Sequence, residues 1–542
     1  MYVTKCQIWK GLIFLDNSLI YCTPEEVGIT SASFLNFIDL ARDRNINIHS
    51  LLVMRHGKIA AELYWNPYCA EEAHHLYSVS KSFTATAVGF AIAEGLLSPE
   101  DRVASFFPRK IHRGCDDRIY SVTVEHLLTM SAGIVSANEV TMLNHVDWIK
   151  WFLNSPLEFF PGDKFSYNSL DTYILSAILR KVTGMGLVDY LMPRLFEPLG
   201  IERPLWLTCP MGIECGGWGL HLKTTDIAKF VRLYLDRGIW NGKRILPEEW
   251  IDSALSIHAD PGSDQKFLEH PDTKAGYGYC FWRGRDNSWR ADGMFGQYGI
   301  MLPDSDTVIV TTSASPNQML VLDLLWDTIV PAIDSIPENS EPGEDNIALI
   351  EAAAKLSVSR IESVQCADGL CDTINGKKFI FAQNTQSMMP FLVRSLYKIP
   401  WLGIDNVQFD FPGDGSLAFS WSESYCRNSF SLIIGGADIV CDLTFGGTVL
   451  KSVVSADWTS ERTLTIDIRP INTPHNARIS FEFDGDRVTY SYDEDPPFDT
   501  SLKMFFDLAQ VMRPLSGQLS KIAGGLIPSI TGIVEIDTEN EF

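Results

Sequence analysis

Residues 77–95 read Tyr-Ser-Val-Ser-Lys-Ser-Phe-Thr-Ala-Thr-Ala-Val-Gly-Phe-Ala-Ile-Ala-Glu-Gly. Small and apolar residues fill this stretch almost all the way round, which is typical of a helix buried in a large core. Ser78 and Lys81 stand at its first turn, and a spacing of three residues places both side chains on one face. Because desolvation disfavours a charged ammonium, the stretch predicts a neutral amine that can take a proton from the hydroxyl.

The pattern Ser-x-x-Lys does not identify a nucleophile by itself. It also occurs at Ser263 to Lys266, after a Pro-Gly turn, and at Ser395 to Lys398, just before Ile-Pro-Trp. Only Ser78 opens a long apolar helix. The alternative for Ser78 is a helix cap beside an exposed lysine, so other motifs have to decide.

Composition restricts the classes of function. A chain of 542 residues can hold two or more domains, and its net charge of −24 argues against nucleic acid and anionic membrane surfaces as partners. The eleven cysteines lack metal-ligand spacing, and an odd, dispersed set fits reduced thiols in a cytoplasm. The N-terminus has no clear cleavage site, and no apolar stretch reaches about 18 residues. We therefore expect a cytoplasmic protein without a membrane span, a metal or an organic cofactor.

The chain divides by composition into four parts. Residues 1–22 form an N-terminal extension, and residues 23–335 alternate helical and strand patterns. Residues 336–346 are an acidic linker rich in Pro and Gly. Residues 347–542 begin with a helix and continue in short alternating runs, including an Asp484-Gly485 turn between two arms. The last part is therefore predicted to be a mostly antiparallel β-barrel or sandwich.

A second stretch carries polar groups at the entrance to a helix. Tyr167-Asn168-Ser169 follows a Pro-Gly turn and precedes a strongly apolar run. Beside an activated serine, the Tyr167 hydroxyl could carry the proton to a leaving group. The alternative is a packed surface aromatic.

A third stretch combines strand character with glycines. Residues 289–302 read as a strand segment that contains Gly293, Gly296 and Gly299. Such glycines indicate either a close backbone approach or a plain bulge. His74 and His75, just before the Ser78 helix, are expected to be loop or core histidines because no metal-ligand cluster accompanies them.

These stretches together resemble a known family. Ser78-Val-Ser-Lys81, Tyr167-Asn-Ser169 and Ala291-Asp-Gly-Met-Phe-Gly-Gln297 have the order and approximate spacing of the three active-site motifs of penicillin-recognising serine hydrolases. Gly216-Gly-Trp-Gly-Leu and Trp240-Asn-Gly-Lys are similar to the branch with class C β-lactamases, family VIII esterases and 6-aminohexanoate-dimer hydrolase. The resemblance covers roughly residues 23–335. It implies an α+β fold in which helices and a helical subdomain flank an antiparallel sheet.

The resemblance also implies roles for individual residues. Ser78 would be the nucleophile, Lys81 its general base, and Tyr167 a partner in the proton transfers. The backbone N–H groups of Ser78 and Met294 would form the oxyanion hole. Ser169 stands where many relatives have asparagine, and we expect it to contact substrate.

Further substrate contacts are expected around the third motif. Gly293 would open the strand to the substrate. Trp218, Phe295 and Tyr298 are candidates for lining the pocket, although each could equally be a core residue.

One departure from the family bears on the substrate. β-Lactamases and peptidoglycan peptidases carry Lys-Thr-Gly in the third motif, where this chain has Ala291-Asp292-Gly293. The cation that helps hold a substrate carboxylate is missing and an acid has been added. The sequence therefore favours hydrolysis of an ester or amide of a small molecule through an acyl-enzyme.

Two other functions remain open. One is a peptidase for D-amino-acid or short peptides, or a weak β-lactamase. The other is a non-catalytic binding protein on the same fold, which the complete Ser78, Lys81 and Tyr167 set disfavours.

Overall fold

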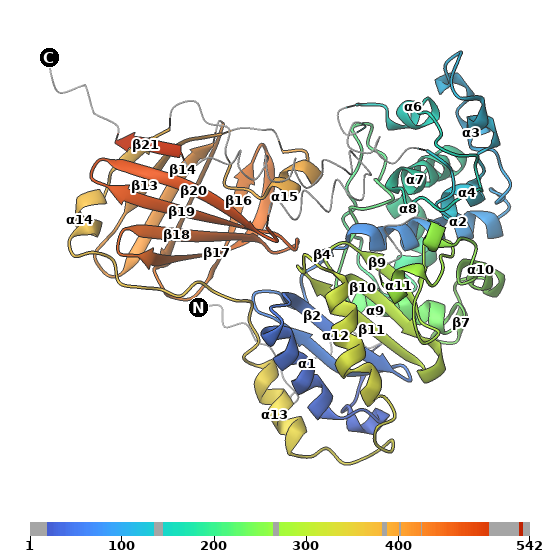
Figure 1. Ribbon diagram of the computed structural model, residues 1–542, viewed down its shortest axis with the longest axis horizontal. Helices are drawn as coiled ribbons and strands as arrows, with labels where there is room; N and C mark the ends of the chain where they lie inside the picture. Colours follow the sequence, from blue (N-terminus) through green and yellow to red (C-terminus); the bar gives the residue numbers. More distant parts are fainter. Residues whose placement is uncertain are drawn as a thin grey trace. The chain divides into compact units, whose positions relative to one another are not determined.

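The computed structural model describes residues 19–134, 142, 145–263, 270–381, 387–399, 403–423, 425–497 and 530–534. Two compact units divide these residues, and the division falls between Val358 and Ser359 (Figure 1). The first unit holds residues 19–358, and the second holds residues 359–497 with the strand at 530–534. The predicted N-terminal extension lies, up to residue 18, outside the described residues.

A seven-stranded sheet forms the centre of the first unit. Its strand order is β1-β3-β2-β11-β10-β9-β8, and every pair is antiparallel except β1 with β3. All eight residues of β2 are buried, which shows that both faces of the sheet are covered. The strands are β1 (Ile20–Tyr21), β2 (Ile48–Arg55), β3 (Lys58–Tyr64), β8 (Trp282–Arg283), β9 (Trp289–Gly293), β10 (Gln297–Leu302) and β11 (Thr307–Ser313).

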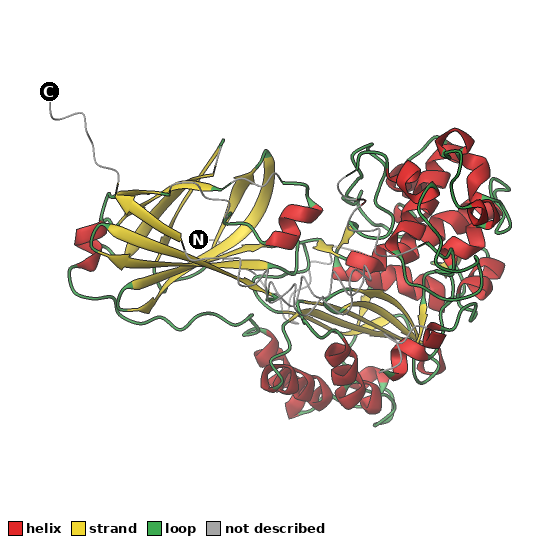
Figure 2. Cartoon of the chain, turned by 45° about the horizontal axis from the view of Figure 1, so that its top comes forward, coloured by secondary structure: helices red, strands yellow, loops and turns green. Residues whose placement is uncertain are grey.

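Helices cover both faces of this sheet (Figure 2). On one face, α9 (Thr224–Leu235) packs so closely that a Cβ at Gly299 would lie 2.8 Å from Val231. Helices α1 (Ser31–Asp43) and α12 (Met319–Thr328) pack against each other on the other face (Figure 1). The remaining α-helices of the first unit are α2 (Ser80–Ala93), α3 (Val103–Phe106), α4 (Val124–Leu128), α6 (Trp148–Leu153), α7 (Ser169–Thr183), α8 (Leu187–Leu191), α10 (Glu248–Ala254), α11 (Pro271–Lys274) and α13 (Glu344–Ala353).

Helix α2 is the central element of the first unit. Twelve consecutive residues, Ser80 to Ala91, are buried, as the composition of residues 77–95 predicts. Helix α7 packs along it. The short helix η2 (Tyr77–Val79) leads into α2, so Ser78 lies at the entrance to the most buried helix of the unit. The sheet and these helices confirm the predicted α+β architecture.

Helix α13 belongs to the first unit. It packs against α1, and its Leu349 is 6% exposed. The chain after it is tied back by backbone hydrogen bonds from Asn66 N to Leu356 O and from Val358 N to Asn66 O, each 3.0 Å. The sequence alone places this helix in the second domain, after a linker at residues 336–346. The unit boundary lies later, because the apolar face of α13 is buried on α1.

The second unit is built from one antiparallel sheet of ten strands. The order is β15-β14-β13-β12-β21-β20-β19-β18-β17-β16, and the two edge strands β15 and β16 contact each other, as in a barrel. In β14, buried side chains alternate with half-buried ones, and the buried set forms an aromatic core. The predicted antiparallel domain and the hairpin at Asp484-Gly485 are confirmed. The strands are β12 (Lys378–Ile380), β13 (Ile404–Asp410), β14 (Ser416–Glu423), β15 (Cys426–Ile433), β16 (Ile439–Phe445), β17 (Thr448–Ser460), β18 (Thr463–Pro470), β19 (Asn476–Asp484), β20 (Arg487–Asp495) and β21 (Ile530–Val534), and the helices are α14 (Leu370–Ile374) and α15 (Phe391–Leu396).

Within the described part of the chain, no helix is long and apolar enough to cross a membrane.

Candidate active site

Ser78 lies at the junction of η2 and α2, where the chain turns sharply. Tyr77, just before it, has a φ of 48°, a left-handed conformation that costs energy in a bulky residue. The Ser80 hydroxyl donates to the Tyr77 carbonyl oxygen over 2.6 Å and holds this turn. Ser78 is partly exposed, although both its neighbours are buried. A substrate can therefore reach the Ser78 hydroxyl.

Three acceptors surround the amine of Lys81. Its Nζ lies 2.8 Å from Ser78 Oγ, 3.1 Å from Ser169 Oγ and 2.9 Å from the Gly217 carbonyl oxygen. The Lys81 residue is 1% exposed. When the amine donates hydrogen bonds to Ser169 and Gly217, its third tetrahedral position points at Ser78. That position holds a proton when the amine is charged and a lone pair when the amine is neutral. This geometry lets a neutral Lys81 accept the proton of the Ser78 hydroxyl.

The carbonyl oxygen of Gly217 belongs to a loop before β5 (His221–Leu222). The contact of this loop with Lys81 is not among the sequence-based predictions. Thr84 Oγ1 donates to the Gly216 carbonyl oxygen over 2.8 Å, and Leu220 N donates to Ser80 Oγ over 3.1 Å, so α2 anchors the loop at both ends. A Cβ at Gly217 would lie 2.7 Å from Thr172 Oγ1. In the sequence, the pair Gly216-Gly217 indicates this close approach, because only glycine allows the loop to lie so near α7.

Ser169 begins α7, and Asn168 caps it. The Asn168 side chain accepts a hydrogen bond of 2.8 Å from Leu170 N, as N-cap residues do. The cap fixes the first turn of α7, from which the Ser169 hydroxyl reaches Lys81. Ser169 is itself partly exposed. The residue expected only to contact substrate is thus also a direct partner of Lys81.

Tyr167 lies over the amine of Lys81. The Nζ atom is 4.8 Å from the centroid of the Tyr167 ring, within the range of a cation–π contact when the amine is protonated. The ring stacks on Trp282 at 5.7 Å and meets Tyr277 edge-on at 6.3 Å. These aromatic neighbours fix the Tyr167 ring beside Lys81.

The third motif lies against the segment that precedes Ser78. Gly293 ends β9, and a Cβ there would lie 2.3 Å from the Leu76 carbonyl oxygen. Met294 follows in the turn to β10, closed by a hydrogen bond of 3.2 Å from Gly296 N to the Gly293 carbonyl oxygen. Of the two alternatives predicted for these glycines, a close backbone approach or a plain bulge, Gly293 shows the close approach, to the backbone of Leu76. It brings the backbone around Met294 near the entrance of α2.

The acid of the third motif is not an isolated charge. Asp292 Oδ2 accepts a hydrogen bond of 2.8 Å from Arg290 Nε, and Asp292 Oδ1 accepts one of 3.1 Å from Gln318 Nε2. Burial raises the pKa of Asp292, while the charge of Arg290 and the hydrogen bond from it lower that pKa. Arg290 is itself 2% exposed. The added acid is thus compensated by a neighbouring cation, which the sequence analysis did not pair with it.

The three expected pocket residues have different surroundings. Trp218 is partly exposed, and its ring lies 5.8 Å from that of Trp148. Tyr298 is 0% exposed and donates to the Gln318 carbonyl oxygen over 3.0 Å. Phe295 is likewise 0% exposed and meets Tyr77 edge-on at 5.4 Å. Only Trp218 has surface to offer a substrate, because the other two rings are enclosed in the core.

Four buried histidines pack behind the Ser78 turn. His74 Nδ1 lies 3.0 Å from the His75 carbonyl oxygen and must donate to it, so its Nε2 accepts from His49 Nδ1 at 3.1 Å. Burial lowers the pKa of His74 to about 3 and that of His221 to about 4. His74 and His221 are therefore neutral core residues, held by the ladder of β4 (His74–His75) and β5 (His221–Leu222). Among the described residues, no group of three or more His, Cys, Asp or Glu is arranged to hold a metal.

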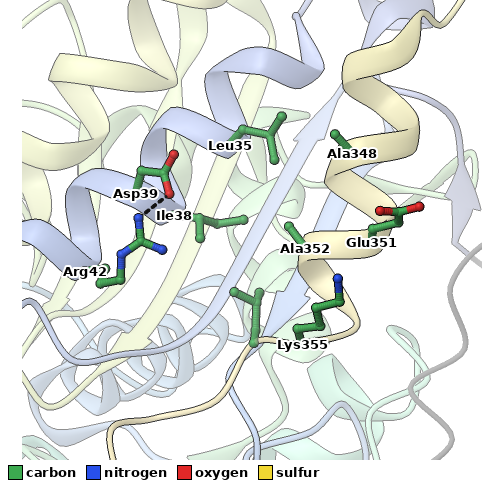
Figure 3. Close-up of a pocket in the computed structure, with 9 residues that line it drawn as sticks. Leu35, Ile38, Asp39, Arg42, Ala348, Glu351, Ala352 and Lys355 are labelled. Carbon is green, nitrogen blue, oxygen red and sulfur yellow. Dashed lines mark hydrogen bonds and ion pairs between the residues drawn. The ribbon is translucent and has the colours of Figure 1, made fainter.

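A groove lies between α1 and α13, apart from these residues (Figure 3). Its volume is about 400 Å³. Small and apolar side chains such as Ile38 and Ala352 line it, and the ion pair of Asp39 with Arg42, 2.6 Å long, lies along one side (Figure 3). None of the candidate catalytic residues lines it.

The chain matches one protein family and is similar to several known proteins. The sequence profile described as Beta-lactamase matches residues 37–327, more than half of the chain. The chain is 27% identical over 288 residues to the 6-aminohexanoate-dimer hydrolase of Paenarthrobacter ureafaciens, covering 49% of this chain and 73% of that protein. A family VIII carboxylesterase structure aligns with a TM-score of 0.43 and 18% identity over 62% of this chain and 98% of the other. The octameric penicillin-binding protein homologue from Pyrococcus abyssi aligns with a TM-score of 0.42 and 17% identity over 85% of this chain and 97% of the other.

The profile match covers η2, α2, α7 and β9, the elements that carry Ser78, Lys81, Ser169 and Gly293, and it includes Tyr167 in the loop before α7. It confirms the resemblance drawn from the three motifs. This chain belongs to the β-lactamase family of hydrolases.

Proposed function

We propose that the chain is a serine hydrolase that cleaves an ester or amide bond of a small molecule through an acyl-enzyme on Ser78. The observation that carries the proposal is the contact of 2.8 Å between Lys81 Nζ and Ser78 Oγ. The two further acceptors of the amine, Ser169 and Gly217, support it because they orient the amine toward the nucleophile.

The first half-reaction forms the acyl-enzyme. Ser78 Oγ attacks the carbonyl carbon of the substrate while its proton passes to the neutral amine of Lys81. The carbonyl oxygen becomes an oxyanion, and the backbone N–H groups of Ser78 and Met294 donate to it; such donors contribute about 3–4 kcal/mol each in well-studied hydrolases. The bond to the leaving group then breaks, and the leaving group takes the proton from Lys81 by way of the Tyr167 hydroxyl.

The second half-reaction releases the acid. A water molecule loses a proton to the Lys81 and Tyr167 pair and attacks the acyl carbon. The ester bond to Ser78 breaks, and the proton returns to Ser78 Oγ. Neither half-reaction calls for a group beyond these side chains and backbone donors.

The third motif favours a neutral substrate over an anionic one. Ala291 replaces the lysine that helps hold a substrate carboxylate in β-lactamases, and the nearby cation Arg290 is already paired with Asp292. The similarity to 6-aminohexanoate-dimer hydrolase makes a linear amide a natural second substrate class beside simple esters.

A substrate panel tests this proposal. We expect turnover of short p-nitrophenyl esters or of the 6-aminohexanoate dimer, and little or none of nitrocefin. Preferential cleavage of D-alanyl peptides would replace the proposal with a D-amino-acid peptidase, and faster turnover of nitrocefin than of any ester or amide would replace it with a β-lactamase. Folded protein with no turnover of any substrate and no reaction with a fluorophosphonate would favour a binding role.

A further inference from the structure

Two half-buried cysteines of the second unit face each other. The Sγ atoms of Cys366 and Cys371 lie 3.7 Å apart, although five residues of extended chain would separate them by about 17 Å. Both thiols pack at the edge of the aromatic core of this unit. Their proximity is a property of the fold that sequence spacing alone does not give.

A tight turn brings the two thiols together. Gly369 has a φ of 73°, and Leu370 N donates to the Ala367 carbonyl oxygen over 3.1 Å. The left-handed conformation of Gly369 reverses the chain at the start of α14 and directs Cys371 back toward Cys366. The turn itself is exposed at Asp368 and Gly369, so a small molecule can approach it from solvent.

The segment around the turn is anchored to the sheet. Val364 N donates to the Trp458 carbonyl oxygen over 2.7 Å, and Ala367 N donates to the Glu461 carbonyl oxygen over 2.8 Å. On the other side, α14 is held by Ile374, which is 0% exposed. Both thiols are thus kept in place from opposite ends, and a bond between them, about 2.0 Å long, needs only a small movement of the exposed turn.

We propose that Cys366 and Cys371 form a modification site at which a low-molecular-weight disulfide, such as oxidised glutathione, converts the two thiols into an intramolecular disulfide. The proposal is independent of the function proposed for Ser78.

The exchange proceeds in two steps. The thiolate of Cys366 attacks one sulfur of the small disulfide, whose S–S bond breaks and releases one small thiolate. The thiolate of Cys371 then attacks the Cys366 sulfur of the mixed disulfide and releases the second small thiolate. The two protons of the protein thiols end on the two released thiols. The protein is oxidised by two electrons, and the small disulfide is reduced.

The order of the steps follows from the surroundings of Cys371. Burial and the neighbouring Cys366 thiol raise the pKa of Cys371 to about 12, so it is a poor first nucleophile. The negative charge of Asp372 also raises the pKa of Cys371. After Cys366 has reacted, Cys371 lies next to the mixed disulfide at a high effective concentration, and closure competes well with a second small thiol.

Peptide mapping of the full-length protein tests the proposal. The protein is incubated with oxidised glutathione, remaining thiols are alkylated, and the chain is digested with trypsin. Residues 361–377 form one tryptic peptide that contains both cysteines and no other. We expect most of this peptide to be lighter than the dithiol form by two hydrogen atoms and to carry no alkyl group. Cys115, another half-buried thiol, serves as the reference and is expected to remain alkylated or to stop at a mixed disulfide.

Single variants and melting temperatures complete the test. Cys366→Ser and Cys371→Ser cannot close the ring, so their peptides are expected to stop at a glutathione adduct or to remain alkylatable. Oxidation should raise the melting temperature of the wild type and not of either variant, because a cross-link restricts the unfolded chain. A wild-type peptide alkylated at both cysteines, or trapped as a glutathione adduct, would overturn the proposal.

Discussion

The amine of Lys81 lies 2.8 Å from the hydroxyl of Ser78 and is enclosed by two more acceptors, Ser169 Oγ and the carbonyl oxygen of Gly217. Residue Lys81 is buried, whereas residue Ser78 is partly exposed. In the proposed reaction, a buried base therefore lies beside a partly exposed nucleophile, as acyl transfer requires.

Replacing Lys81 by methionine removes the base and keeps most of the side-chain volume. We expect kcat for ester hydrolysis to fall by about 10²–10⁴-fold, the range contributed by a positioned proton acceptor. KM should change much less, since the proposed role of the buried amine is to take the Ser78 proton in the chemical step. Steady-state kinetics measure both constants, and a cooperative melt shows that the variant is folded. An active, folded Lys81→Met protein would exclude Lys81 as the base.

Replacing Ser169 by alanine removes one of the acceptors that orient Lys81. The amine then has an N–H without its partner and can turn away from Ser78, at a cost of about 1–3 kcal/mol. We expect kcat/KM to fall by about tenfold, equivalent to roughly 1.4 kcal/mol. Ser169→Thr keeps the hydroxyl and should retain more activity than Ser169→Ala. Equal activities of the two variants would show that the hydroxyl does not orient the amine.

Replacing Gly217 by alanine should displace its loop. The new Cβ would lie 2.7 Å from Thr172 Oγ1 and 2.8 Å from the Ser169 carbonyl oxygen, so the loop has to move and the Gly217 carbonyl oxygen leaves Lys81. We expect a lower melting temperature and a lower kcat. Gly343→Ala is the matched control, because a Cβ there meets nothing within 4 Å. If both variants behaved like the wild type, the Gly217 contact would have no catalytic role.

The buried His74 predicts a dependence of stability on pH. Its pKa is lowered from 6.5 to about 3 by burial, so below pH 6.5 the unfolded chain binds a proton that the folded chain does not. Proton binding at His74 in the unfolded chain therefore reduces the free energy of unfolding as the pH falls from about 6.5 to about 3, by up to about 1.4 kcal/mol per pH unit.

Denaturant titrations at several pH values measure this term as a difference between proteins. His74→Asn keeps a donor for the His75 carbonyl oxygen but does not titrate. We expect the wild type to lose more stability than His74→Asn between pH 6.5 and pH 4. Parallel curves for the two proteins would show that His74 is not held neutral by the fold.

Local sequence patterns predicted several elements well because their causes are local. The buried helix expected within residues 77–95 is η2 followed by α2, and the hairpin expected at Asp484-Gly485 joins β19 and β20. The meeting of Ser78 with Lys81 follows from helical periodicity alone. The placement of Tyr167 beside them came from family resemblance, since no local rule joins residues 86 positions apart.

Other features depend on contacts between distant segments. The pairing of Asp292 with Arg290 was hidden because two residues on the same face of a strand need a third element, here Gln318, to fix their orientation. For Tyr298 and Phe295 the sequence left both a pocket and a core position open, and packing encloses both rings in the core. Helix α13 follows an acidic linker in sequence, and only its burial on α1 assigns it to the first unit.

The most direct test of the account is the intact mass of the protein after incubation with a short p-nitrophenyl ester, compared with Ser78→Ala. We predict that the wild type gains the mass of the acyl group during turnover, that peptide mapping places the acyl group on Ser78, and that Ser78→Ala gains nothing while melting like the wild type. Turnover by Ser78→Ala at the wild-type rate, or an acyl group on another residue, would contradict the assignment of Ser78 as the nucleophile.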